Sequence, residues 1–166
     1  MGSAIGGQAA RDLDSLHIQQ LGTGERNSVQ IQLLHPRATL PSRAHQTDAG
    51  LDISSVRAVF IPPGTTELVP VGFAVTPPPG MYMQLISRSS LAKRGITVEG
   101  GVIDPGYTGE VSVILRNSSA EPYAVAVGER VAQMIAHMLP IVAVQAVDKL
   151  GQHDRGKKGF GSSGTS

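Results

Sequence analysis

The chain has 166 residues, of which 40% are hydrophobic and 16% charged, with a formal net charge of +1 and no cysteine. This length suits one domain with a single core, and the lack of cysteine excludes disulfides, thiolate metal sites and cysteine nucleophiles. The small net charge provides no global electrostatic field that would attract nucleic acid. No apolar run reaches the roughly 20 residues that span a bilayer, so we expect a soluble intracellular protein, in the cytoplasm or nucleus. Its origin can be cellular or viral.

Residues 1–27 are rich in Gly, Gln and Ala without sustained periodicity, which predicts a flexible leader. A β-rich domain is expected over residues 28–148, because 20 glycines and 11 prolines separate short Val- and Ile-rich runs. From about residue 148 the chain is polar and Gly-rich, which predicts a flexible C-terminal arm over 149–166. Strands are predicted at 29–33, 58–61, 67–71, 81–86, 110–115, 123–127 and 141–147.

Two segments have helical features. Residues 89–95 predict a short helix, because a serine can cap its first amides and Gly95 can end it. In residues 130–139 the apolar side chains recur at helical spacing, so periodicity alone favours a helix there, although the segment lies between predicted strands.

Three segments carry candidate chemistry. Residues 100–109 place one carboxylate, Asp104, and one ring, Tyr107, on a glycine-flanked hairpin that a flat ligand can approach; alternatively, this is an ordinary Asp-Pro-Gly turn. Residues 88–90 (Arg-Ser-Ser) form either a phosphate cradle or a simple helix cap. In the tail, Arg155 can clamp a phosphate and Phe160 can stack on a base, unless the tail is a functionless terminus.

Two other patterns carry no function. Residues 159–164 fit a Gly-x-Gly-x-x-Gly pattern, but no helix can follow in the two remaining residues and no βαβ context precedes them. The five histidines, at positions 17, 35, 45, 137 and 153, are scattered without metal-ligand spacing.

Taken in order, five segments resemble the five motifs of the trimeric dUTPase family. They are residues 49–53, 88–92, 101–109, 128–133 and 155–164. Each motif is weak alone, but the ordered set, which covers the chain from about Val29 to its end, is specific. The resemblance implies an all-β fold, a distorted jelly-roll β-barrel, in a homotrimer whose swapped C-terminal arm closes a neighbour's active site. It also favours a strand over residues 130–139.

The resemblance implies hydrolysis of dUTP to dUMP and pyrophosphate with Mg²⁺, which limits uracil in DNA and supplies dUMP for dTTP synthesis. In this family Asp104 activates the water that attacks the α-phosphate, and Asp52 holds magnesium through bound water. Tyr107 lies under the deoxyribose and rejects ribonucleotides, while the hairpin backbone pairs with uracil. The implied substrate-binding residues are Arg88, Ser89, Ser90, Gly100, Gly101, Ile103, Tyr107, Gln133, Arg155, Phe160, Gly161, Ser162 and Ser163. We expect neither a membrane nor a direct nucleic-acid partner.

Two alternatives remain open. The dCTP deaminases share the implied fold, but they use a glutamate on the strand after the hairpin, where this chain has Ile114, which cannot transfer protons. A non-catalytic or moonlighting binding module gated by nucleotide is the other alternative. The presence of Asp104, Tyr107, Arg155 and Phe160 argues against a loss of catalysis.

Overall fold

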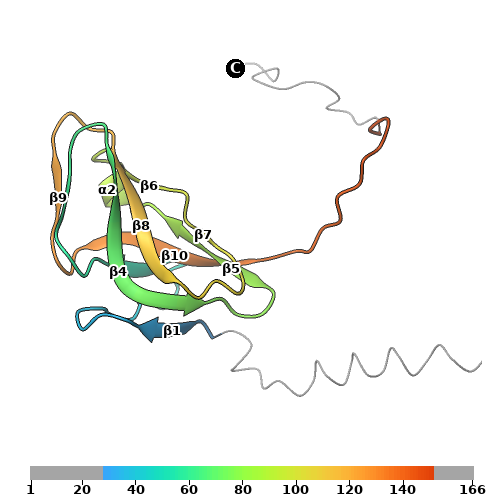
Figure 1. The fold of residues 1–166 in the computed structure, drawn as a ribbon, viewed down its shortest axis with the longest axis horizontal. Helices are drawn as coiled ribbons and strands as arrows, with labels where there is room; N and C mark the ends of the chain where they lie inside the picture. Colours follow the sequence, from blue (N-terminus) through green and yellow to red (C-terminus); the bar gives the residue numbers. More distant parts are fainter. Residues whose placement is uncertain (1–27, 152–166) are drawn as a thin grey trace, which may run out of the picture.

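The computed structural model of the chain describes residues 28–151. In this range the elements follow one another as ten strands and one short helix (Figure 1): β1 (Gln30–Leu33), β2 (Leu51–Ser54), β3 (Val59–Ile61), β4 (Thr66–Thr76), β5 (Met81–Ile86), α2 (Ser89–Ala92), β6 (Ile96–Glu99), β7 (Val102–Ile103), β8 (Glu110–Asn117), β9 (Tyr123–Val125) and β10 (Arg130–Met138). No helix among these residues is long and apolar enough to cross a membrane.

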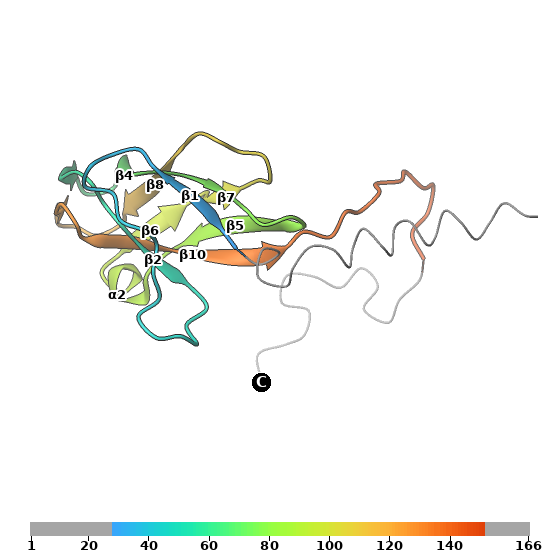
Figure 2. The same ribbon diagram turned by 90° about the horizontal axis from the view of Figure 1, so that it is seen from below.

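The strands form two four-stranded antiparallel sheets and one two-stranded sheet. The strand orders are β1-β4-β8-β6, β2-β10-β5-β7 and β3-β9. Buried side chains from both larger sheets meet in one core cluster, to which Phe73 and Val113 contribute from one sheet and Met83 and Met134 from the other. The two sheets therefore pack face to face around a single core (Figure 2). This arrangement confirms the all-β fold and the distorted jelly-roll barrel.

Most predicted strands are confirmed with small shifts at their ends, although the strand predicted at 67–71 is longer and forms β4 over Thr66–Thr76. The strand predicted at 81–86 coincides with β5, and the alternation that predicted 110–115 continues through β8, whose residues are buried with a period of two. The short strands β2, β6 and β7 were not predicted; none exceeds four residues, which is too short to show a clear period.

Residues 130–138 form strand β10, as the family resemblance favoured, and not the helix that periodicity alone favoured. The strand pairs with β2 on one edge and with β5 on the other. Its backbone hydrogen bonds are therefore satisfied by two neighbours that are distant in sequence, and this outweighs the helical spacing of its apolar residues.

Two predictions are wrong. Residues 141–147 form no strand; Ile141 and Val144 are 98% and 97% exposed, and the segment runs away from the barrel (Figure 1). Within the described chain no sheet edge accompanies this segment, and a strand cannot form without one. The predicted serine cap of the short helix is also absent, because the N-cap residue of α2 is Arg88 and no side chain caps the helix.

Candidate functional site

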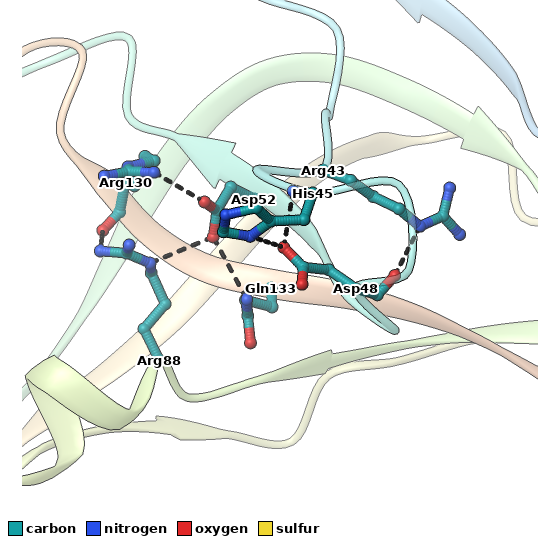
Figure 3. Close-up of polar contacts among 7 residues, drawn as sticks. All are labelled: Arg43, His45, Asp48, Asp52, Arg88, Arg130 and Gln133. Atoms are coloured by element: carbon teal, nitrogen blue, oxygen red, sulfur yellow. Dashed lines mark hydrogen bonds and ion pairs between the residues drawn. The ribbon is translucent and has the colours of Figure 1, made fainter.

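Three polar side chains meet around Asp52 on β2 (Figure 3). The register of β2 and β10 places Asp52 opposite Gln133, and Arg130 lies at the start of β10. Arg88 Nε donates to Asp52 Oδ1 at 3.1 Å, and Arg130 Nη1 donates to Asp52 Oδ2 at 3.0 Å. Gln133 Nε2 approaches Oδ1 at 3.4 Å. One carboxylate thus anchors two guanidinium groups, and we call these four residues the Asp52 cluster.

The Asp52 cluster carries more positive than negative charge, since it contains two guanidinium groups and one carboxylate. Arg88 Nη1 also donates to the Arg130 carbonyl oxygen at 3.2 Å, which fixes the two arginines relative to each other. Directly after Arg88, Ser89 and Ser90 are exposed and begin α2, where their N–H groups have no carbonyl four residues earlier in the helix. Guanidinium groups, hydroxyls and free amides are the groups that bind phosphate oxygens.

The start of β10 is held in place by Glu129. Its carboxylate accepts hydrogen bonds from Tyr123 Oη and, at 2.8 Å, from the Ala126 backbone N–H. The Arg94 guanidinium lies 4.8 Å from the centroid of the Tyr123 ring. Burial, helped by the bond to Glu129, raises the pKa of Tyr123 to about 12. Glu129 therefore stabilises the turn that presents Arg130.

Asp104 and Tyr107 lie in the tight turn between β7 and β8. The Tyr107 N–H donates to the Asp104 carbonyl oxygen at 3.2 Å, and Pro105 and Gly106 occupy the central positions. Gly106 has a φ of 84°, which a type II turn requires at its third residue and which favours glycine. The segment is thus the Asp-Pro-Gly turn that its sequence indicates, and this turn fixes Asp104 and Tyr107 relative to each other.

A hollow of about 250 Å³ opens beside this turn. Asp104, Tyr107 and a second exposed carboxylate, Glu99, lie along its wall; the other lining residues are Leu85, Gly101, Val102, Ile103, Val111, Ser112 and Ile114. Apolar side chains combined with a few polar groups are typical of a site for a flat organic ring. The hollow also shows that Ile114 faces the same space as Asp104.

The hairpin backbone lies tightly against β5. The Leu85 N–H donates to the Gly101 carbonyl oxygen at 2.7 Å, and a Cβ atom at Gly101 would lie 2.7 Å from the Leu85 carbonyl oxygen. Gly101 also has a φ of 94°. Only glycine fits this close approach. The predicted residues Gly101, Ile103, Asp104 and Tyr107 therefore all line one hollow, and Gly100 lies next to them in the chain.

Asp52 and the hairpin lie at opposite edges of one sheet, and the other residues of the Asp52 cluster come from β10 and from just beyond the end of β5. In the order β2-β10-β5-β7, Asp52 lies on the first strand, and Asp104 follows the last. Neighbouring strands are about 4.8 Å apart, so these edges are separated by roughly 14 Å. Among residues 28–151, no hydrogen bond or ion pair joins Asp104 or Tyr107 to the Asp52 cluster. In a single copy, Asp104 and Tyr107 thus lie across the sheet from Asp52, and in the described chain they make no polar contact with the Asp52 cluster.

The polar residues fit a magnesium ion only in a limited way. In the described part of the chain, no group of three His, Cys, Asp or Glu side chains is arranged to hold a metal ion. Both oxygens of Asp52 already accept hydrogen bonds from guanidinium groups. This donor set suits Mg²⁺ that keeps its waters and is carried by substrate phosphates, not an ion in a protein cage.

Some residues of interest fall outside the predicted set or outside the described chain. Arg130 and Glu99 were not predicted as site residues, although Arg130 lies in the fourth motif and Glu99 directly precedes the glycine pair of the hairpin. The predicted contacts in the tail lie outside the described residues and stay predictions; they are Arg155, Phe160, Gly161, Ser162 and Ser163.

The chain is similar to known proteins over most of its length. The model of the dUTPase family matches residues 36–164. A deoxyuridine 5'-triphosphate nucleotidohydrolase of Solibacter usitatus is 43% identical over 148 residues, which cover 84% of this chain and 97% of that protein. A protein of the same name from Solanum lycopersicum is 39% identical over 151 residues, which cover 89% of each chain.

Solved structures show the same fold. The dUTPase of Staphylococcus bacteriophage 80alpha, solved with dUpNHpp, has a TM-score of 0.79 and 28% sequence identity, and the match covers 84% of this chain and 99% of that one. The dUTPase of the S. aureus phage phi11, described with a structural Mg(II) ion, has a TM-score of 0.70 and 25% identity over 76% of this chain and 100% of that one. With a family model that spans most of its length, the chain belongs to the dUTPase family.

Proposed function

We propose that this chain hydrolyses dUTP to dUMP and pyrophosphate. One observation carries the proposal: in this chain of the dUTPase family, a tight turn holds Asp104 and Tyr107 together on the wall of a hollow of about 250 Å³. Relatives are named for hydrolysis of this nucleotide, and a structural neighbour was solved with dUpNHpp. In a cell, the reaction would limit uracil in DNA and supply dUMP for dTTP synthesis.

In the proposed reaction Asp104 acts as the general base. Its carboxylate takes a proton from a water molecule, whose oxygen forms a bond to the α-phosphorus while the bond from that phosphorus to the bridging oxygen breaks. The electron pair leaves with pyrophosphate. Asp104 is exposed at the first position of the turn, so water can reach it. The protein needs no covalent intermediate, because positioning and charge neutralisation supply most of the catalysis of phosphoryl transfer.

Recognition of the nucleoside is assigned to the hairpin. Backbone groups of Gly100, Gly101 and Ile103 pair with the edge of uracil, and the close walls of the hollow exclude the methyl group of thymine. The Tyr107 ring lies under the deoxyribose, where a 2′-hydroxyl would clash. A hollow with a mostly apolar lining and few polar groups supports this assignment.

Recognition of the triphosphate is assigned to the Asp52 cluster and the tail. Arg88, Ser89, Ser90 and Gln133 contact phosphate oxygens, and the arm over residues 149–166 closes the site through Arg155, Phe160, Gly161, Ser162 and Ser163. Bound Mg²⁺ would neutralise charge on the phosphates. Asp52 would hold the ion through a bound water, since both of its oxygens already accept from guanidinium groups.

The complete site is proposed to form between copies in a homotrimer. The separation of roughly 14 Å between Asp52 and the hairpin supports this, because the groups of one catalytic site must surround a single substrate. The lack of a polar contact between Asp104 or Tyr107 and the Asp52 cluster within the described part of one copy supports it too. The exposed apolar side chains of residues 141–147 support it as well. A neighbouring copy would cover them as the arm crosses over.

The reaction is tested by comparing two carboxylates that line the same hollow. Purified wild type, Asp104→Asn and Glu99→Gln are assayed for pyrophosphate release from dUTP, with and without Mg²⁺. We expect Asp104→Asn to lose activity by about 10²–10⁴-fold, the usual contribution of a general base, while Glu99→Gln loses far less. If Glu99→Gln were the inactive variant, Glu99 would be the base and not Asp104.

A substrate panel separates the alternatives. We expect hydrolysis of dUTP to exceed that of dCTP, dTTP and UTP, and no ammonia release from dCTP. Ile114 faces the hollow where a deaminase would need a proton-transferring side chain, which argues against deamination. Nucleotide binding without any pyrophosphate release would instead identify a binding module.

A further inference from the structure

The Tyr107 ring is held in one position by the backbone of the hairpin. A Cβ atom at Gly109 would lie 2.6 Å from Tyr107 Oη, 2.8 Å from Cζ and 3.1 Å from Cε2. The first two distances are shorter than real Cβ atoms tolerate and the third is tight, so the ring occupies space that only glycine leaves open. At its tip, Tyr107 Oη donates a hydrogen bond to the Glu110 carbonyl oxygen at 3.0 Å. The ring therefore has a fixed support at its edge and a fixed partner at its hydroxyl.

A side chain at position 109 would displace the ring and leave the backbone in place. Gly109 has no positive φ, so other residues can adopt its backbone conformation without strain. The atoms that would clash are at the far end of the Tyr107 side chain, which is 45% exposed and has room to move. Leaving the support would also break the hydrogen bond to Glu110, because that bond requires the present position of the hydroxyl.

We propose that Gly109 is a positioning residue that fixes the sugar-facing wall of the hollow. The inference rests on the proposed function, in which Tyr107 rejects a 2′-hydroxyl by contact. Steric rejection of one hydroxyl requires a wall that does not yield, and a ring free to swing away from the hairpin would yield. Gly109 and the Glu110 carbonyl thus act through Tyr107 to set the preference for dUTP over UTP.

The first test is the kinetics of Gly109→Ala with both nucleotides. We expect the ratio of kcat/KM for dUTP to that for UTP to fall by about tenfold or more, since small misplacements of a binding group have effects of this size. The KM for dUTP should rise more than its kcat falls, because Asp104 precedes the displaced ring in the turn and keeps its place. Thr108→Ala, which changes the adjacent exposed residue, is the matched control and should alter the ratio less than twofold. A Gly109→Ala enzyme with the wild-type ratio would overturn the proposal.

A double-mutant comparison shows whether Gly109 acts through the ring. In a Tyr107→Ala background the ring is absent, so adding Gly109→Ala should change the ratio no further. A structural role of Gly109 elsewhere in the hairpin would lower activity again in the double variant. That additive result would contradict a role through Tyr107.

A readout without turnover separates this inference from the proposed function. The chain has three tyrosines, at positions 82, 107 and 123, so ring-labelled protein gives few NMR signals to follow. Gly109→Ala should shift one ring signal, and Tyr107→Ala should identify it by its loss. An unmoved Tyr107 signal would refute the inference even in an active enzyme. If the Tyr107 signal moves in Gly109→Ala but the wild-type protein does not hydrolyse dUTP, only the proposed function is refuted.

Discussion

Removing the charge of Asp52 should destabilise the protein through the two arginines that it anchors. Asp52→Asn keeps the shape of the side chain and one acceptor oxygen, but the amide no longer neutralises Arg88 and Arg130. Asp52→Ala removes both acceptors. Because a guanidinium group cannot lose its proton, the N–H groups that Asp52 accepted from must then bind water or stay unsatisfied.

The exposure of each partner determines the size of the effect. The side chain of Asp52 is 9% exposed, and those of Arg88 and Arg130 are 21% and 54% exposed. The largely buried bond to Arg88 should contribute about 1.5–3 kcal/mol, as hydrogen bonds to charged groups do. The pair with Arg130 should contribute about 1 kcal/mol or less, because water screens it. We therefore expect a loss of roughly 2–4 kcal/mol for Asp52→Ala and about half of that for Asp52→Asn.

The assay is urea unfolding followed by circular dichroism at one fixed protein concentration, since assembly of copies contributes to apparent stability. Asp48→Asn is the matched control, because Asp48 lies four residues away on an exposed loop (Figure 3). Its carboxylate accepts from the His45 N–H at 2.9 Å, an exposed contact that should contribute far less than the Arg88 pair. If Asp52→Asn unfolds at the same urea concentration as Asp48→Asn, the anchoring role is wrong.

The same Asp52→Asn protein tests the proposed contact with Mg²⁺. If Asp52 holds the ion through a bound water, the magnesium concentration for half-maximal dUTP hydrolysis should rise several-fold. If Asp52 acts only by orienting Arg88 and Arg130, the KM for dUTP should rise while the magnesium midpoint stays unchanged. The second outcome would remove the metal contact from the mechanism.

Three further predictions concern the turn, the core and the arm. Gly106→Ala and Gly64→Ala each place a side chain at positive φ in open space, so each should lower the free energy of unfolding by about 1 kcal/mol in thermal unfolding. Only Gly106→Ala should impair dUTP hydrolysis, and equal activities of the two variants would show that the turn does not position Asp104. Folding raises the pKa of Tyr123 to about 12, so the contribution of Tyr123 to stability is complete below its unfolded pKa near 10 and is lost as pH rises through 12. The free energy of unfolding should therefore fall more steeply between about pH 10 and 12 in wild type than in Tyr123→Phe. Truncation before Arg155 should leave a folded trimer by light scattering with severely reduced dUTP hydrolysis; full activity would exclude the arm from the site.

The parts of the structure that the sequence predicts are those fixed by local chemistry. The Asp-Pro-Gly-Tyr turn follows from the restricted φ of Pro105 and the positive φ that Gly106 tolerates, which are properties of the residues themselves. The alternation in β8 is likewise local, since successive side chains of any strand point to opposite faces. The ordered motifs belong to this class too, because they can be read without knowing what lies beside them.

Tertiary structure decided whatever depends on a neighbour that is distant in the chain. Residues 130–138 have a helical pattern, yet they form β10 because β2 and β5 offer hydrogen bonds on both edges. Residues 141–147 have a strand pattern, yet in a single copy they form no strand because no edge lies beside them. Arg130 reaches Asp52 across 78 positions of sequence, a separation at which local preference carries no information. Backbone and charged groups must find partners somewhere, and only the folded chain determines which partners are within reach.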